Sequence, residues 1–260
     1  MVDEWTARFK RWLPAQESLF QQSPAAFHDD IGFFCAGQLQ HFLCHQIGLE
    51  YKPEERDAVE VYYTNPSDLF LNGLIDTRVG TCGNMAALHV AIARRCGWPV
   101  SLACVKNHHV SRYENGSLAI NIECTVKVPG GFSAGSDADY LKRFKLPDLA
   151  KNCGSDLRTF SMREMLGVFV GLRARHYYDI RRLDLCDVEC CLARTLLPNR
   201  RPLYALATDP YLERGQALFT PEERGHPRQL YEYLAERYEP QRASLHRGIS
   251  YVSIHQLRIP

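Results

Sequence analysis

The feature that most constrains the fold of this chain is an apolar run that begins at residue 85. Residues 85–93 are apolar except for a single histidine, and they contain neither glycine nor proline. A helix that is apolar on nearly every side must lie buried against other elements. We therefore expect a buried helix that starts near residue 82 and ends at Cys96-Gly97.

Cys82 stands at the start of this helix, within Gly80-Thr81-Cys82-Gly83-Asn84. At a helix N-terminus, the backbone N–H groups and the helix dipole favour the thiolate over the thiol. A thiolate that solvent can reach is a nucleophile, whereas a cysteine deep in a core is inert. The two glycines and the helix start favour the nucleophile.

Strands are predicted directly after the helix. Val100 to Cys104 alternates apolar and small residues, and His108 to Tyr113 indicates a second strand. The Asn115-Gly116 pair is typical of a tight hairpin turn, and Leu118 to Thr125 forms the returning strand. The predicted order is helix, strand, strand, turn, strand.

The hairpin supplies partners for a cysteine nucleophile, which needs a base, a group that orients the base, and oxyanion donors. His108 and Glu123 are nearly symmetric about the turn, so their side chains are expected to meet. Asn121 shares a strand face with Glu123, and either residue could orient the histidine. The backbone N–H of Cys82 is an oxyanion donor in this scheme.

Other interpretations of these residues stay open. His109 is the second candidate for the base, although strand alternation predicts that it points to the other face of the sheet. Glu123 could instead pair with Arg112 across the hairpin. His89 lies too far along the helix axis to reach the thiol and is expected to be a hydrogen-bonded core residue. Gly130-Gly131 and the acidic residues Asp137 and Asp139 are expected in a loop that borders the site.

The succession Gly-Thr-Cys-Gly, His-His-Val-Ser-Arg-Tyr and Ile-Asn-Ile-Glu-Cys-Thr resembles the transglutaminase-like branch of the papain-like cysteine enzymes. The segment from Asn65 to Arg78 is similar to the bacterial subset related to the SirB1 group. The resemblance covers about residues 65–144. It implies Cys82 as nucleophile, His108 as base and Glu123 as the acidic third member. The usual third residue is Asp, so the longer Glu leaves room for Asn121 to share the role.

The resemblance implies an α+β fold, with the cysteine-bearing helix packed on a small antiparallel sheet and helical flanks on both sides. We expect an N-terminal helical region at 1–64 packed on the core, the core at 65–145, and a mostly helical region at 146–260. In the last region, helices are predicted at Met162–Tyr178 and Leu183–Leu196. A further helix start is predicted at Thr220-Pro221, and a short strand near residues 249–254.

Composition narrows the class of partner. The net charge of +1 predicts no strong attraction to nucleic acid or to an anionic membrane. No apolar stretch is long enough to span a bilayer, and the N-terminus lacks the order of a Sec signal, so a cytoplasmic protein is expected, with signal-independent export left open. The ten cysteines lie mostly in apolar patterns and form no CxxC pair, which favours reduced thiols.

The leading hypothesis is a thiol enzyme without a cofactor that cleaves or transfers amide bonds of a protein or peptide substrate. Hydrolysis, deamidation and transamidation stay open, as does the oligomeric state. The competing hypothesis is an inactive module of the same fold that binds a partner through its helical flanks. A metal site on His41, Cys44 and His45 is a distant third, because no further ligand follows with motif spacing.

Overall fold

The computed structural model describes residues 1–56, 62–106, 108–116, 118–146 and 154–200. The chain divides into two compact units. The first comprises residues 1–57, 65–145 and 157–161, and the second comprises the remainder. The first unit therefore contains the predicted core together with most of the N-terminal helical region.

The predicted central helix is present as α5 (Cys82–Arg95), and it begins at the cysteine. Its side chains are buried along almost its whole length, including those of Met85, Leu88 and Ile92. The helix packs against the first three strands of the sheet. The apolar composition of residues 85–93 is thus explained by burial on nearly every side of the helix.

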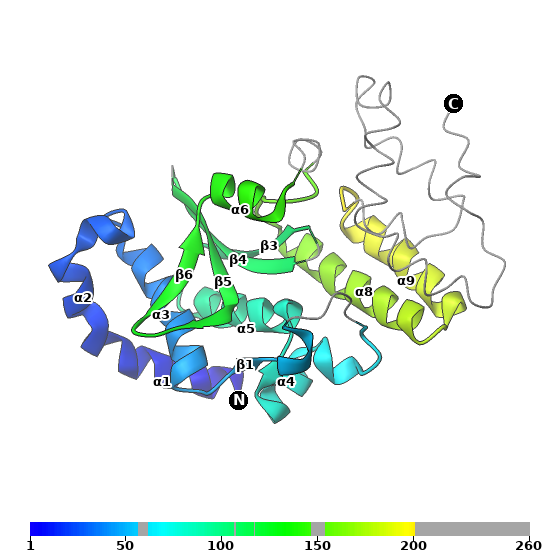
Figure 1. Ribbon diagram of the computed structural model, residues 1–260, viewed down its shortest axis with the longest axis horizontal. Helices are drawn as coiled ribbons and strands as arrows, with labels where there is room; N and C mark the ends of the chain where they lie inside the picture. The colour runs from blue at the N-terminus through cyan, green and yellow to red at the C-terminus, as the bar shows by residue number, and fades with distance from the viewer. Residues whose placement is uncertain (57–61, 107, 117, 147–153, 201–260) are drawn as a thin grey trace, which may run out of the picture. The chain divides into compact units, whose positions relative to one another are not determined.

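The sheet is antiparallel, with the strand order β3-β4-β5-β6, and the fold class is α+β as predicted. Its strands are β3 (Val100–Val105), β4 (His108–Asn115), β5 (Leu118–Val128) and β6 (Gly131–Gly135). The predicted turn joins β4 to β5, with Asn115 opposite Leu118. Figure 1 shows α5 along one face of this sheet and α6 (Asp137–Phe144) on the other.

The expected loop after β5 is instead a strand followed by a helix. Gly131 lies on β6, while Asp137 and Asp139 lie in the first turn of α6. Ser136 caps this helix, and its hydroxyl donates to the Asp139 carboxylate at 2.6 Å. The Ser-x-x-Asp spacing is typical of a capping box, which marks the start of a helix. The sequence therefore contains a local signal for α6 that favours a helix over a loop.

The N-terminal part is helical as far as residue 45. It contains α1 (Val2–Trp12), α2 (Glu17–Gln22) and α3 (Ile31–His45), with short 3-10 turns at Leu13–Gln16 and Pro24–Phe27. Phe9 packs on Phe42 and Trp98, which holds α1 against the rest of this unit. Asp30 caps α3 by accepting a hydrogen bond from the Phe33 N–H at 2.9 Å.

The helical character predicted for residues 1–64 is wrong around residue 50, where the chain is extended. Glu50–Tyr51 forms β1, which pairs in parallel with β2 (Val79–Gly80). A 3-10 turn at Pro53–Glu55 follows β1. Another at Pro66–Asp68 precedes α4 (Leu71–Thr77). Pairing between segments so distant in sequence leaves no local signal.

The described part of the second unit is dominated by α8 (Met162–Asp179) and α9 (Leu183–Leu196), which agree with the predicted helices. Ala174 and Tyr178 of α8 pack with Cys186 and Cys190 of α9. The predicted helix start at Thr220 and the strand near residues 249–254 lie outside the described residues. Among the described helices, none combines the length and the apolar character needed to cross a membrane.

Candidate active site

The backbone before Cys82 is held by a set of hydrogen bonds from neighbouring segments. The Lys52 N–H donates to the Gly80 carbonyl at 2.8 Å. The Thr81 hydroxyl donates to the Asp68 carbonyl at 2.8 Å, and the Thr81 N–H donates to Asn84 Oδ1 at 2.8 Å. These bonds fix the start of α5 and with it the position of the thiol.

Gly80 is required by packing at this turn. A Cβ at this position would meet Asn84 Oδ1 at 2.5 Å and Leu74 Cδ1 at 2.7 Å. The Asn84 atom is the one that caps the Thr81 N–H, so any side chain at residue 80 would displace the cap. The glycine before the cysteine is therefore explained by the close approach of Asn84.

Two adjacent histidines at the start of β4 act on the thiol. His109 Nδ1 lies 3.6 Å from Cys82 Sγ, and His108 acts on the thiol through its charge. The expectation that His109 points away from Cys82 is therefore wrong. Helix α5 lies on the face of β4 that carries the odd-numbered side chains, as the bond from Ser111 Oγ to the Ala86 carbonyl at 3.2 Å shows.

His108 belongs by alternation to the opposite face, where it meets Glu123. His108 Nε2 lies 2.8 Å from Oε2 and 3.0 Å from Oε1 of Glu123. Thr125 supports the same carboxylate, with its hydroxyl donating at 2.7 Å and its N–H at 3.1 Å. The ring of His108 also stacks on Phe144 of α6, with centroids 5.7 Å apart. Since Nε2 is committed to Glu123, Nδ1 is the nitrogen that remains for the thiol.

Asn121 lies on the same face but has other partners. Its Oδ1 accepts from Arg112 Nη1 at 2.9 Å, and its Nδ2 donates to Asp137 Oδ1 at 2.9 Å. Arg112 in turn pairs with Asp137 at 2.5 Å. The structure therefore brings Glu123, and not Asn121, to the histidine. The alternative pairing of Glu123 with Arg112 is replaced by the Arg112–Asp137 pair.

The charges of these groups are strongly coupled. Burial raises the pKa of the Cys82 thiol, but hydrogen bonds from His108 and His109 outweigh burial and lower that pKa to about 5. Burial lowers the pKa of His108, yet the Glu123 charge and the bond to Cys82 raise it to about 10. For Glu123, burial raises the pKa, while the charge and hydrogen bond of His108 lower it to about 2. The favoured state is a thiolate, an imidazolium and a carboxylate.

His109 is also charged in this state. Burial lowers its pKa, but interactions with Cys104 and Cys82 raise it to about 9. The sequence analysis ranked His109 only second as a partner of the thiol, because alternation says which side chains share a face but not which face meets the helix. Tyr51 was not predicted to lie near the thiol. Burial and the Cys82 charge both raise the pKa of its hydroxyl.

The other histidines singled out in the sequence do not join this site. His89 is fully buried, its Nε2 donates to the Ala36 carbonyl at 2.8 Å, and burial lowers its pKa to about 4. His41 and His45 stack on each other and hydrogen-bond to the carbonyls of Gly131 and Val128. The core role predicted for His89 is confirmed.

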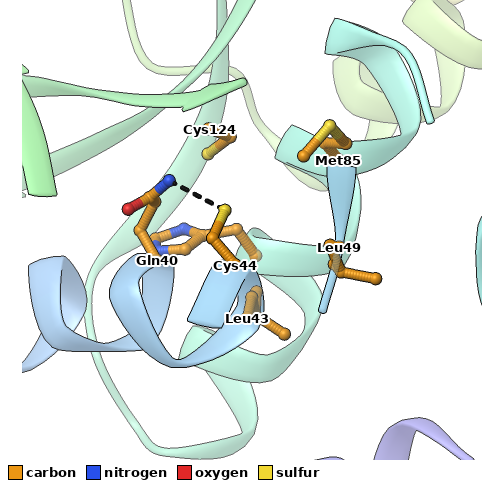
Figure 2. A pocket seen from close by; sticks show the side chains of 7 residues that line it. Gln40, Leu43, Cys44, Leu49, Met85 and Cys124 are labelled. Atoms are coloured by element: carbon orange, nitrogen blue, oxygen red, sulfur yellow. Dashed lines mark hydrogen bonds between the residues drawn. The ribbon is translucent and has the colours of Figure 1, made fainter. Parts of the chain in front are cut away.

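Cys44 faces a small cavity of about 10 Å³ (Figure 2). Gln40 Nε2 donates to Cys44 Sγ at 3.2 Å, and Met85 and Cys124 line the same space. Within the described ranges, no cluster of three histidine, cysteine or acidic side chains has metal-binding geometry.

No protein family, no curated protein and no solved structure matches this chain. The transglutaminase-like resemblance therefore stays a prediction carried by the residues themselves.

Proposed function

We propose that this chain is a transglutaminase-like thiol enzyme that acts on carboxamide or peptide bonds. The observation that carries the proposal is the cluster of Cys82, the two histidines and Glu123, in which Cys82 Sγ lies 3.6 Å from His109 Nδ1 and His108 Nε2 lies 2.8 Å from Glu123 Oε2. A nucleophile, a base and a carboxylate that orients the base are the parts that thiol catalysis needs. A papain-like arrangement of helix and sheet is part of this proposal.

In the first half-reaction, the Cys82 thiolate attacks the carbonyl carbon of the amide. A carbon–sulfur bond forms, and the carbonyl π electrons move to the oxygen. The N–H of Cys82, in the first turn of α5, has no acceptor within its own helix and can donate to that oxyanion. When the intermediate collapses, the carbon–nitrogen bond breaks, and His108 gives its Nδ1 proton to the leaving nitrogen. The products are a thioester on Cys82 and a free amine or ammonia.

In the second half-reaction, neutral His108 accepts a proton from water or from an amine that attacks the thioester. The carbon–sulfur bond then breaks, and its electron pair returns to sulfur as thiolate. Water gives hydrolysis or deamidation, while an amine gives transamidation. Glu123 keeps the His108 ring in the orientation that both halves require.

The competing function is a binding module of the same class without catalysis. The observation in its favour is burial, because Cys82 is only 4% exposed. His108 is the more accessible member, with 19% of its side chain exposed. A binding module has no need of a thiolate, so the chemistry of Cys82 separates the two functions.

A trapped thioester tests the proposal. Incubation with p-nitrophenyl acetate at pH 7 is expected to release a burst of p-nitrophenol stoichiometric with the chain. Tandem mass spectrometry should then locate the acetyl group on Cys82 and not on Cys96, the partly exposed cysteine at the other end of α5. Absence of the burst, or acetyl groups spread equally over both cysteines, would favour the binding module.

A further inference from the structure

His109 occupies a position that a Cys–His–carboxylate triad does not require. Its Nδ1 lies 3.6 Å from Cys82 Sγ, and its side chain is enclosed, with the residue only 7% exposed. Across the β3–β4 pair it stands directly opposite Cys104, which is its other hydrogen-bond partner. Its ring thus lies between two thiols.

The charge of the triad explains why a second histidine is present. A thiolate on Cys82 and a carboxylate on Glu123 carry two negative charges, and His108 supplies only one positive charge. Cys82 is 4% exposed and Glu123 is 1% exposed, so one negative charge would be left buried. An uncompensated buried charge is costly, and the group normally neutralises instead. Without a second cation, protonation of Cys82 would remove the excess negative charge at the lowest cost in free energy.

We infer that His109 is a positioning residue, a second imidazolium that balances the buried charge and keeps Cys82 as a thiolate. The inference rests on the proposed thiol chemistry. It also divides the work between the two histidines. His108 has a carboxylate partner and partial exposure, so it moves the proton, whereas the enclosed His109 holds charge and does not touch the substrate.

Other ionisable groups surround the thiol and must be taken into account. Tyr51 on β1, Glu55 on the 3-10 turn that follows and Glu123 on β5 are all electrostatically coupled to this site. Tyr51 and Glu55 are neutral or negative, so neither can supply a positive charge. His108 and His109 are cations that act on Cys82. Cys104 also acts on His109, so it is a further thiol near the site that can carry negative charge.

The test is the rate of Cys82 carbamidomethylation by iodoacetamide as a function of pH, measured on the full chain. His109→Asn keeps a hydrogen-bond donor near the Nδ1 position but removes the charge. We expect the midpoint of the pH curve to rise by at least one pH unit, with at least about tenfold slower labelling at pH 6 and the same plateau at high pH. An unchanged midpoint in a folded His109→Asn variant would overturn the inference.

A second measurement keeps the inference testable if that variant does not fold. In the unmodified protein, the ring NMR signals of His109 should report a protonated imidazole up to about pH 8. A neutral ring at pH 7 would contradict the inference. The failure of the proposed function looks different, because then Cys82 of the unmodified protein would label with the pH dependence of an ordinary thiol.

Discussion

Replacement of Cys82 by alanine is expected to reduce the turnover of p-nitrophenyl acetate to the rate of the buffer alone. Thioester formation requires the sulfur of Cys82 at the N-terminus of α5. The substitution removes one buried atom and leaves the cap between Thr81 and Asn84 in place, so the fold should persist. Initial rates, together with thermal unfolding followed by circular dichroism, measure both effects.

The matched control for this variant is Cys96→Ala. Cys96 stands at the C-terminal end of the same helix, where burial raises the pKa of its thiol. Its removal should leave turnover unchanged. Equal rates for the Cys82→Ala variant and the unmodified chain would show that any acyl transfer occurs elsewhere, and the thiol enzyme would be refuted.

Replacement of His108 by asparagine is expected to cause the second large loss of turnover. Asparagine cannot exchange a proton with the leaving nitrogen or with water, so turnover is expected to fall by about 10²- to 10⁴-fold. The Glu123 carboxylate also loses its imidazolium partner, which contributes to keeping the pKa of that carboxyl near 2. Steady-state kinetics at pH 7, with the amount of folded protein matched, give the measurement.

His28→Asn is the corresponding control. His28 is exposed and has a left-handed backbone with φ of 57°, a conformation that asparagine tolerates. This variant should retain full activity. A His108→Asn variant that also retained full activity would transfer the role of base to His109, which was the second candidate in the sequence.

The helix and the hairpin of the first unit could be predicted because their signals are local. An apolar run after a glycine-flanked cysteine marks α5, and Asn115-Gly116 marks the turn between β4 and β5. The parallel pairing of β1 with β2 joins segments nearly thirty residues apart in sequence, so no short pattern reveals it. Strand β6 is short and rich in glycine, which gives it little strand character in the sequence.

Three of the four predicted site residues, Cys82, His108 and Glu123, lie together, and strand geometry explains why Asn121 does not join them. Asn121 stands directly opposite Arg112 in the register, so its amide joins the Arg112–Asp137 pair. Glu123, with its longer side chain, reaches His108 from a diagonal position. Sequence symmetry about the turn cannot distinguish a direct from a diagonal neighbour. Asp137 was expected beside the site but in a loop, so its pairing with Arg112 from the first turn of α6 was not predicted.

The pH range of the active state follows from the direction of each pKa shift. The Cys82 pKa is lowered, so the thiolate form is held above about pH 5 and is lost as the pH falls through that value. The His108 pKa is raised, so its imidazolium persists as the pH rises until about pH 10, and His109 until about pH 9. Thiolate and imidazolium groups therefore coexist from about pH 5 to about pH 9, which is the range in which activity is expected.

The most direct test of the central claim compares two cysteines of one helix. Carbamidomethylation of Cys82 and Cys96 in the unmodified full chain is followed by mass spectrometry from pH 4 to pH 10. The account predicts that Cys82 labelling rises with a midpoint near pH 5, while the midpoint for Cys96 lies above pH 9. If Cys82 followed the same curve as Cys96, the thiolate and the function built on it would be contradicted.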